Sequence, residues 1–507
     1  MTSLSRLLVA TTLVASTLDV RNAAAQDHTH LGRGGKEVIG TVHFPTTCAP
    51  SVAPRMDRAI ALLHSFEFGA TLKALDGVLA SDSTCAMAYW GIALARWGNP
   101  MAAGNRAPAL LAQGSTAASA AVRHASHASA RERGYIGAVS LLYHDYEHTD
   151  QRSRVVAYER AMARLVAAQP ADTEAKIFHA IALVATALPA DQTYAKQIEA
   201  GRILEALWAK QPNHPGLAHY IIHAYDVPAL APRARLAAQR YATIAPSAAH
   251  ALHMPSHTFT RVGMWQASAD ANARSMQVAA RTASIAEMLH AADYAMYADL
   301  QLGRWREAKA ILDSLPALAS RFDPNAVTGA APGSAGVFAL AAIPARWALE
   351  RRAWAEASAI VPASTAVPYA DAMSWFARAL GASHTGDTAR ARAAIDTLNA
   401  IQQRLAAGAE PYWAEQVAIQ SLGAQAWLAL AEHRDSEALA TMRDAARRED
   451  ATEKSAVTPG PLAPARELLG DMLVALGRPA EARTEYRATL TREPGRRHAT
   501  QAVATTH

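Results

Sequence analysis

The sequence has 507 residues, of which 51% are hydrophobic and 6% aromatic, and its formal net charge is +5. A chain of this length and apolar content can bury extensive surface, but it is too long for one compact core to be expected. Lysines and arginines are scattered among acidic residues, with no basic run and no interleaving of basic and aromatic residues, which argues against a nucleic-acid partner.

The N-terminus has the order of features found in export signals. Arg6 precedes an apolar stretch from Leu7 to about Leu18, and three alanines at 23–25 precede Gln26. We therefore predict a signal peptide over residues 1–25 and an N-terminal extension over 26–57, in a periplasmic or secreted protein. An uncleaved membrane anchor is the alternative, and no later run is long enough to span a membrane.

Cys48 and Cys85 are the only cysteines in the chain. In an oxidising compartment an even pair of cysteines most simply forms one disulfide, which here would hold the N-terminal extension against the first helices. If the chain is not exported, two buried reduced cysteines are the alternative.

Between residues 215 and 300, histidines and aspartates recur at helical spacings. Residues three or four positions apart lie on one face of a helix, and imidazoles and carboxylates on facing helices are what a divalent metal site needs. Pro255 stands among these residues and either kinks a helix or begins a new one. The residues at these spacings are His219, His223 and Asp226, then His250, His253 and His257, then His290 and Asp293.

A short motif recurs from residue 263 to the C-terminus. A turn residue is followed two places later by an aromatic or other residue and three places after that by a small residue, between two apolar-periodic segments of helical length. This pattern predicts helix hairpins repeated along the chain, and no strand-like alternation of any length is present. The turn residues are Gly263, Gly303, Arg352, Gly386, His433 and Gly477.

The motif resembles that of tetratricopeptide repeats (TPRs). The last unit matches most completely, with Leu469-Gly470, Ala482, Tyr486 and Pro494 at the family's spacing. Segments around residues 62–66, 85–91 and 249–257 look like those of exported bacterial TPR proteins of unassigned biochemical role. The resemblance implies an all-α, TPR-like solenoid of antiparallel helix hairpins with a concave groove. We expect such a solenoid with a His-rich groove over 58–320 and further TPR-like repeats over 337–500.

The resemblance also places the histidines in that groove. In TPRs the groove is lined by residues about 13, 10, 6 and 3 places before the turn. A turn near Ala229 puts His219, His223 and Asp226 at the last three of these offsets. Counting back from Gly263 and from Gly303 gives offsets of 13, 10 and 6 for two further sets. These sets are His250, His253 and His257, and His290, Asp293 and Tyr297.

Neutral imidazoles bind zinc, copper or iron, so the sequence predicts a transition-metal site of one or two ions in this groove. The alternative is a wet groove in which the same polar residues bind no ion. Asp226 and Asp293 are candidate ligands or general bases, and Arg261 and Tyr297 are candidates for orienting an anionic or hydrogen-bonding substrate. The predicted metal ligands are His219, His223, His250, His253, His257 and His290.

These residues favour one function and leave two others open. The favoured function is a periplasmic TPR-like solenoid that binds a transition metal, and/or a small ligand or peptide, in the His-rich groove. A metal-dependent enzyme, either a hydrolase or an oxidoreductase, and an interaction scaffold without metal are the alternatives. The expected partner is a small ligand, peptide or protein segment in the concave groove, with no nucleic acid and no membrane span.

Overall fold

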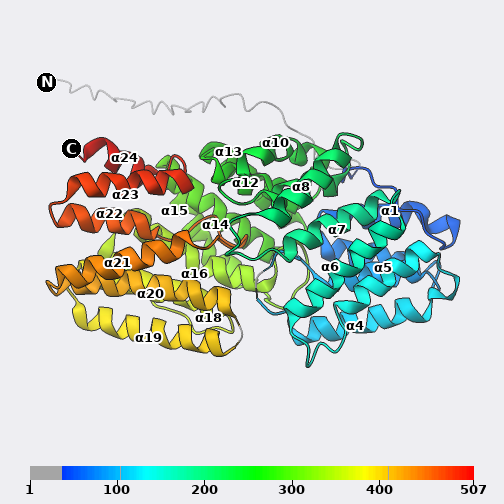
Figure 1. The fold of residues 1–507 in the computed structure, drawn as a ribbon, viewed down its shortest axis with the longest axis horizontal. Coiled ribbons are helices and arrows are strands. Elements are labelled where there is room, and N and C mark those ends of the chain that lie inside the picture. The colour runs from blue at the N-terminus through cyan, green and yellow to red at the C-terminus, as the bar shows by residue number, and fades with distance from the viewer. Residues whose placement is uncertain (1–36, 103, 409, 507) are drawn as a thin grey trace, which may run out of the picture. The chain divides into compact units, whose positions relative to one another are not determined.

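The computed structural model describes residues 37–102, 104–408 and 410–506. The predicted signal peptide over residues 1–25 lies outside these ranges. All regular secondary structure in the described ranges is helical (Figure 1), which confirms the all-α prediction. None of these helices combines the length and the apolar character needed to cross a membrane.

The first part of the chain is built from ten helices that pack on their neighbours in sequence. A short 3-10 helix at Pro50–Val52 precedes the first of them, and two others, at Ala125–His127 and Ala231–Ala234, lie between consecutive α-helices. The α-helices are α1 (Ala53–His64), α2 (Phe68–Leu79), α3 (Ala86–Trp97), α4 (Pro108–Arg123), α5 (Ala130–Leu141), α6 (Gln151–Ala168), α7 (Thr173–Ala185), α8 (Ala195–Trp208), α9 (Pro215–Ala224) and α10 (Arg235–Ile244).

The second part continues as hairpins in which each first helix also packs on the next first helix, as α14, α16, α18 and α20 do. This is the arrangement expected of a TPR-like solenoid. Its helices are α11 (Ala249–His253), α12 (Pro255–Arg261), α13 (Trp265–Arg281), α14 (Ile285–Leu302), α15 (Trp305–Ala319), α16 (Gly333–Glu350), α17 (Trp354–Ala359), α18 (Pro368–His384), α19 (Thr388–Ala407), α20 (Pro411–Ala431), α21 (Asp435–Asp450), α22 (Ala465–Ala475), α23 (Pro479–Arg492) and α24 (Arg497–Thr505).

The predicted turn residues all have left-handed backbone conformations. Gly303, for example, has φ 71°, and its N–H donates to Leu300 O (3.1 Å) while the next N–H, of Arg304, donates to Asp299 O (2.8 Å). These two bonds satisfy the last carbonyls of α14 and reverse the chain. Arg352 and His433 take the same conformation, with φ 56° and 59°, although they are not glycines. The repeat motif therefore marks the hairpin turns correctly.

The apolar core has two main parts. One runs from Ile39 to Ala330 and is built mostly by α1 to α12, and the other runs from Phe338 to Ala502 and is built by α16 to α24. The predicted disulfide is confirmed, since Cys48 and Cys85 are bonded with a Cα–Cα distance of 4.9 Å. It attaches the segment before α1 to the start of α3.

Candidate metal centre

The six predicted metal ligands lie on four helices: α9, α11, α12 and α14. The proline among them begins a new helix, because α11 ends at His253 and α12 starts at Pro255. A proline at this position has no N–H to leave unpaired. The break turns His253 and His257 toward each other, with their Nε2 atoms 3.1 Å apart.

The six imidazoles form two adjacent groups of three. His219, His223 and His250 make the first triad, and His253, His257 and His290 make the second; within each triad the nitrogens that can bind an ion lie within 4.8 Å of one another. The triads touch each other, since the ring centroids of His250 and His253 are 5.8 Å apart and those of His223 and His257 are 6.2 Å apart. This geometry can hold two ions side by side.

Burial favours the neutral, metal-binding form of five of the six imidazoles, those of His219, His223, His253, His257 and His290. All six are at most 6% exposed. Burial, followed by the proximity of the other imidazoles, lowers the pKa of His219, His223 and His290 well below the usual 6.5. Burial also lowers the pKa of His253 to about 3. The pKa of His257 is lowered as well, because the effect of burial outweighs that of Asp226, which raises it.

Oxygen atoms behind the triads hold four of the rings through Nδ1. His219 Nδ1 donates to the backbone oxygen of His64 (2.6 Å), and His253 Nδ1 donates to Asn272 Oδ1 (2.6 Å). The Asn272 amide group is oriented by its own Nδ2, which donates to Ser268 O (2.8 Å). Metal-binding histidines are characteristically oriented in this way, and the tautomer with the proton on Nδ1 leaves Nε2 as a lone pair.

Carboxylates hold the other two of these rings. His250 Nδ1 donates to Glu287 Oε1 (3.1 Å), and His257 Nδ1 donates to Asp226 Oδ2 (2.9 Å). The facing Nε2 atoms of His253 and His257 are therefore both acceptors at 3.1 Å from each other, an arrangement that a shared or nearby cation stabilises.

Among the six predicted ligands, four further ring nitrogens are buried and have no hydrogen-bond partner in the described part of the chain. They are Nε2 of His219, His223 and His250 and Nδ1 of His290. Leaving a buried polar atom unpaired costs about 1–3 kcal/mol. Metal coordination satisfies such atoms without a hydrogen bond.

Of the predicted catalytic residues, Asp226 and Arg261 lie beside the second triad. Arg261 Nε donates to Asp226 Oδ1 (3.0 Å), and Asp226 in turn holds His257. Burial alone would raise the pKa of Asp226, but the positive charges of Lys454 and Arg261 hold it well below its usual value. Asp226 thus acts through His257 as an ionised hydrogen-bond acceptor.

The structure engages Asp293 and Tyr297 elsewhere. Asp293 is paired with buried Arg346 (2.7 Å). Tyr297 donates to Glu493 Oε2 (2.8 Å) and accepts from Arg496 Nη1 (2.8 Å). Equal offsets from the turn therefore give equal positions on the helix, but these two side chains connect α14 to the C-terminal repeats.

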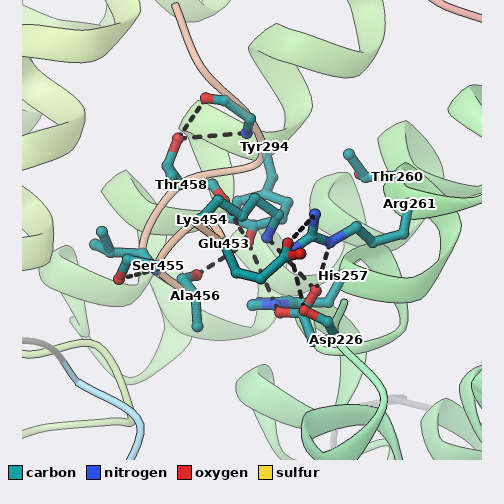
Figure 2. A network of polar contacts seen from close by, with 12 residues as sticks. Asp226, His257, Thr260, Arg261, Tyr294, Glu453, Lys454, Ser455, Ala456 and Thr458 are labelled. Carbon is teal, nitrogen blue, oxygen red and sulfur yellow. Dashed lines mark hydrogen bonds and ion pairs between the residues drawn. The ribbon is translucent and has the colours of Figure 1, made fainter. Parts of the chain in front are cut away.

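A segment from the C-terminal repeats covers the second triad. We call residues 451–464, which join α21 to α22, the strap. Figure 2 shows Glu453 and Lys454 of the strap beside Asp226 and Arg261, with Lys454 Nζ 3.5 Å from Asp226 Oδ1. Tyr294 OH lies 3.0 Å from Ala456 O. The sequence predicts the histidines on the concave surface of the groove, and in the structure they are buried beneath other parts of the chain.

Sequence reasoning missed several residues of the site. Glu287 precedes His290 by three positions, and this Glu-x-x-His spacing, common in metal-binding helix bundles, is the signal that points to it. Asn272 and the strap carry no such signal. A third cluster, in which Glu174 accepts from His64 Nε2 and His214 Nε2 (2.8 Å each), lies behind the first triad.

No protein-family model and no curated protein matches the sequence. The structure is similar to that of yeast Tom70, with a TM-score of 0.38 and 10% identity over 89% of this chain and 87% of that chain. It is also similar to a monomeric mutant of IFIT1 with Gppp-AAAA, with a TM-score of 0.40 and 10% identity over 82% and 90%. The fold assignment rests on the chain's own hairpins and turns.

Proposed function

We propose that this protein binds two transition-metal ions, each through three imidazoles of one triad. The observation that carries the proposal is the pair of Nε2 atoms of His253 and His257, which lie 3.1 Å apart. Each of these rings has a fixed oxygen at its Nδ1, and the tautomer that donates to this oxygen leaves a lone pair on Nε2. The four unpaired nitrogens of the remaining histidines support it.

The ligand set favours zinc or copper. Both ions accept three imidazoles, whereas non-haem iron sites typically add a carboxylate. In this structure the carboxylates of Asp226 and Glu287 are behind the rings, on Nδ1. A bound zinc or copper ion would supply Lewis acidity, and copper also redox chemistry.

An enzymatic role is the second candidate, because a cavity reaches the metal ligands. Four histidines line it: His223, His250, His257 and His290. A site that only stores metal ions, or uses them to stabilise the fold, does not need such a cavity. A metal-dependent enzyme, in contrast, requires space for a substrate beside its ions. An interaction scaffold without metal remains the function if no ion binds.

Metal content tests the proposal. Protein loaded with zinc or copper and freed of excess ion should hold two ions per chain by elemental analysis and native mass spectrometry. His219→Ala and His290→Ala should each hold one, because each removes a ligand from one triad. His148→Ala, at an exposed histidine, is the control and should hold two. Fewer than two ions in the unaltered protein, or unchanged content in both triad variants, would refute it.

We also propose that the chain is exported and cleaved after Ala25. The disulfide between Cys48 and Cys85 supports an oxidising compartment. Intact-mass measurement of the protein from its native source should give a chain that begins at Gln26, and a full-length product would contradict cleavage.

A further inference from the structure

The first triad lies against a carboxylate that is not paired with a lysine or arginine. Glu287 Oε1 accepts from His250 Nδ1 (3.1 Å), and Glu287 is 1% exposed. Burial raises its pKa, but His250 and the other groups around it hold the pKa below its usual value, so Glu287 is ionised. Within the described ranges, no lysine or arginine forms an ion pair with this carboxylate. A cation held by the first triad therefore gains the full attraction of Glu287.

The second triad has a buried lysine beside it. The side chain of Lys454 is 8% exposed, and its Nζ lies 3.5 Å from Asp226 Oδ1 (Figure 2). Nζ also lies 5.9 Å from the centroid of the Tyr294 ring, which is stacked on His257 at 4.7 Å. Asp226 attracts a cation to this triad, but Arg261 and Lys454 are both paired with it. Lys454 Nζ has no hydrogen-bond partner among the described residues, so the lysine contributes mainly its charge.

That charge acts on the imidazoles of the second triad. Burial is the largest cause that lowers the pKa of His257 and of His290, and the positive charge of Lys454 lowers both further. In the first triad, burial and the other imidazoles are the main causes that lower the pKa of His219 and His223, and no lysine or arginine is among them. A charge that disfavours a proton on an imidazole also disfavours a metal ion held by that ring, in proportion to the charge of the ion.

We propose that Lys454 makes the second triad select a singly charged ion, copper(I), whereas the first triad, which faces Glu287, favours a doubly charged ion such as zinc. This inference rests on the proposed metal centre and assigns an ion to each of its halves. Imidazole binds both metals, so the ligands alone do not separate them. The repulsion from Lys454 is twice as large for a doubly charged ion as for a singly charged ion in the same place.

Two single-site proteins measure the triads separately. His219→Ala leaves the second triad complete, and His290→Ala leaves the first. The dissociation constants of zinc and of copper(I) are measured in both proteins by competition against chelators of known affinity, with oxygen excluded for copper(I). The preference for zinc over copper(I), taken as the ratio of the two constants, should be at least about tenfold smaller at the second triad, because the two sites differ by one nearby positive charge.

Replacing Lys454 tests its part in this difference. Lys454→Met keeps the length of the side chain and removes its charge, and it removes no hydrogen bond, because Nζ makes none in the described structure. In the His219→Ala protein it should tighten zinc binding about tenfold and copper(I) binding only about threefold, since the factor for the doubly charged ion is the square of the other. A tighter site is not what damage to the fold produces.

Two control variants accompany this substitution. Lys454→Arg keeps the charge and should keep the ratio of the two dissociation constants. Lys309→Met removes a lysine that is half-exposed and paired with Asp313. It changes the net charge of the protein equally and should change neither constant. Lys454→Gln, which is also uncharged, takes the place of Lys454→Met if the methionine variant does not fold.

The outcomes separate this inference from the proposed function. Unchanged or weaker zinc binding on removal of the Lys454 charge, equal factors for the two ions, or the same tightening at the first triad would overturn the inference and leave the metal centre standing. An equal preference for zinc over copper(I) in the two single-site proteins would do the same. Unaltered protein that holds fewer than two ions per chain would overturn the proposed function, and this inference with it.

Discussion

Replacing Glu287 by glutamine should weaken metal binding at the first triad without removing a ligand. Glu287 Oε1 accepts from His250 Nδ1 (3.1 Å), and its Oε2 accepts from the N–H of Ala331 (2.9 Å). A carboxylate accepts on both sides, but an amide has one accepting oxygen and one donating NH2 group. In Glu287→Gln, the NH2 group of the amide therefore points at either His250 Nδ1–H or the N–H of Ala331, so that two donors face each other.

The magnitude follows from the role of the carboxylate behind the ring. Burial would raise the pKa of Glu287, but His250 and the other donors around it keep the pKa below its usual value, so the group is ionised and the variant removes a charge. Losing such a partner of a metal-bound histidine costs about 10–100-fold in affinity, or roughly 1.4–2.7 kcal/mol. The second triad should keep its affinity, since Asp226 and Asn272 hold its rings.

Competition against a zinc chelator of known affinity measures the two dissociation constants separately. Glu287→Gln should raise one of them and leave the other within about twofold, well inside the tenfold loss expected at the altered site. Glu307→Gln, at a half-exposed glutamate that is paired with Arg306, is the control and should change neither. Equal weakening of both sites, or an unchanged first site, would refute the reasoning about Nδ1 partners.

Three further predictions concern stability in the metal-free protein, measured by denaturant unfolding. Trp265→Ala should lower the free energy of unfolding by about 3–5 kcal/mol, because Trp265 is buried. Trp305→Ala should lower it by about 1 kcal/mol or less, because Trp305 is 39% exposed. Equal losses in the two variants would contradict this prediction. Cys48→Ser should cost roughly 3–4 kcal/mol, since it opens a loop with a sequence separation of 37 residues; an unchanged stability would show that the disulfide contributes nothing. Burial raises the pKa of Glu449 from 4.5 to about 7. The protonated Glu449 therefore contributes to the free energy of unfolding below pH 4.5, and roughly 3 kcal/mol of this stability is lost as the pH rises to 7. Glu449→Gln should flatten this pH dependence of stability, and a variant with an unchanged slope would refute the prediction.

The hairpin turns could be predicted from the sequence because their cause is local. A left-handed residue after a helix, followed by a small residue where two helices approach, leaves a pattern within six positions, as at Gly303 and Ala308. The pattern even located Arg352 and His433, which take this conformation without being glycine. It did not fix exposure: Trp265 and Trp305 each stand two places after a turn glycine, yet Trp265 is buried and Trp305 is 39% exposed.

The convergence of the histidines could also be predicted from the sequence, because a helix fixes which residues share a face. The hydrogen-bond partners behind the rings could not. Glu287 reaches His250 across 37 residues, and the backbone oxygen that holds His219 belongs to His64, 155 residues earlier. Such contacts depend on how helices cross, and helical periodicity in one segment contains no information about the neighbouring helix that it meets.

Asp293 and Tyr297 show the same limit in a different way. Both lie on α14, the helix of His290, yet each side chain is paired with a residue of a later repeat, Asp293 with Arg346 and Tyr297 with Glu493 and Arg496. A buried carboxylate or phenol takes whichever charged partner the fold supplies. Their positions on the helix could be derived from the sequence, whereas their roles required the contacts.

The strap makes the candidate metal centre depend on distant parts of the chain. The six imidazoles come from α9, α11, α12 and α14, but Asp226, which orients His257, lies in an ion-pair network with Arg261, Glu453 and Lys454, two of them from the strap. Burial and Arg261 lower the pKa of Lys454 to about 8, so most of its charge is retained at neutral pH. Arg492 also pairs with Glu453, so the positive charges of the network outnumber its two acids, and Asp226 stays ionised. The C-terminal repeats therefore complete the environment of the second triad.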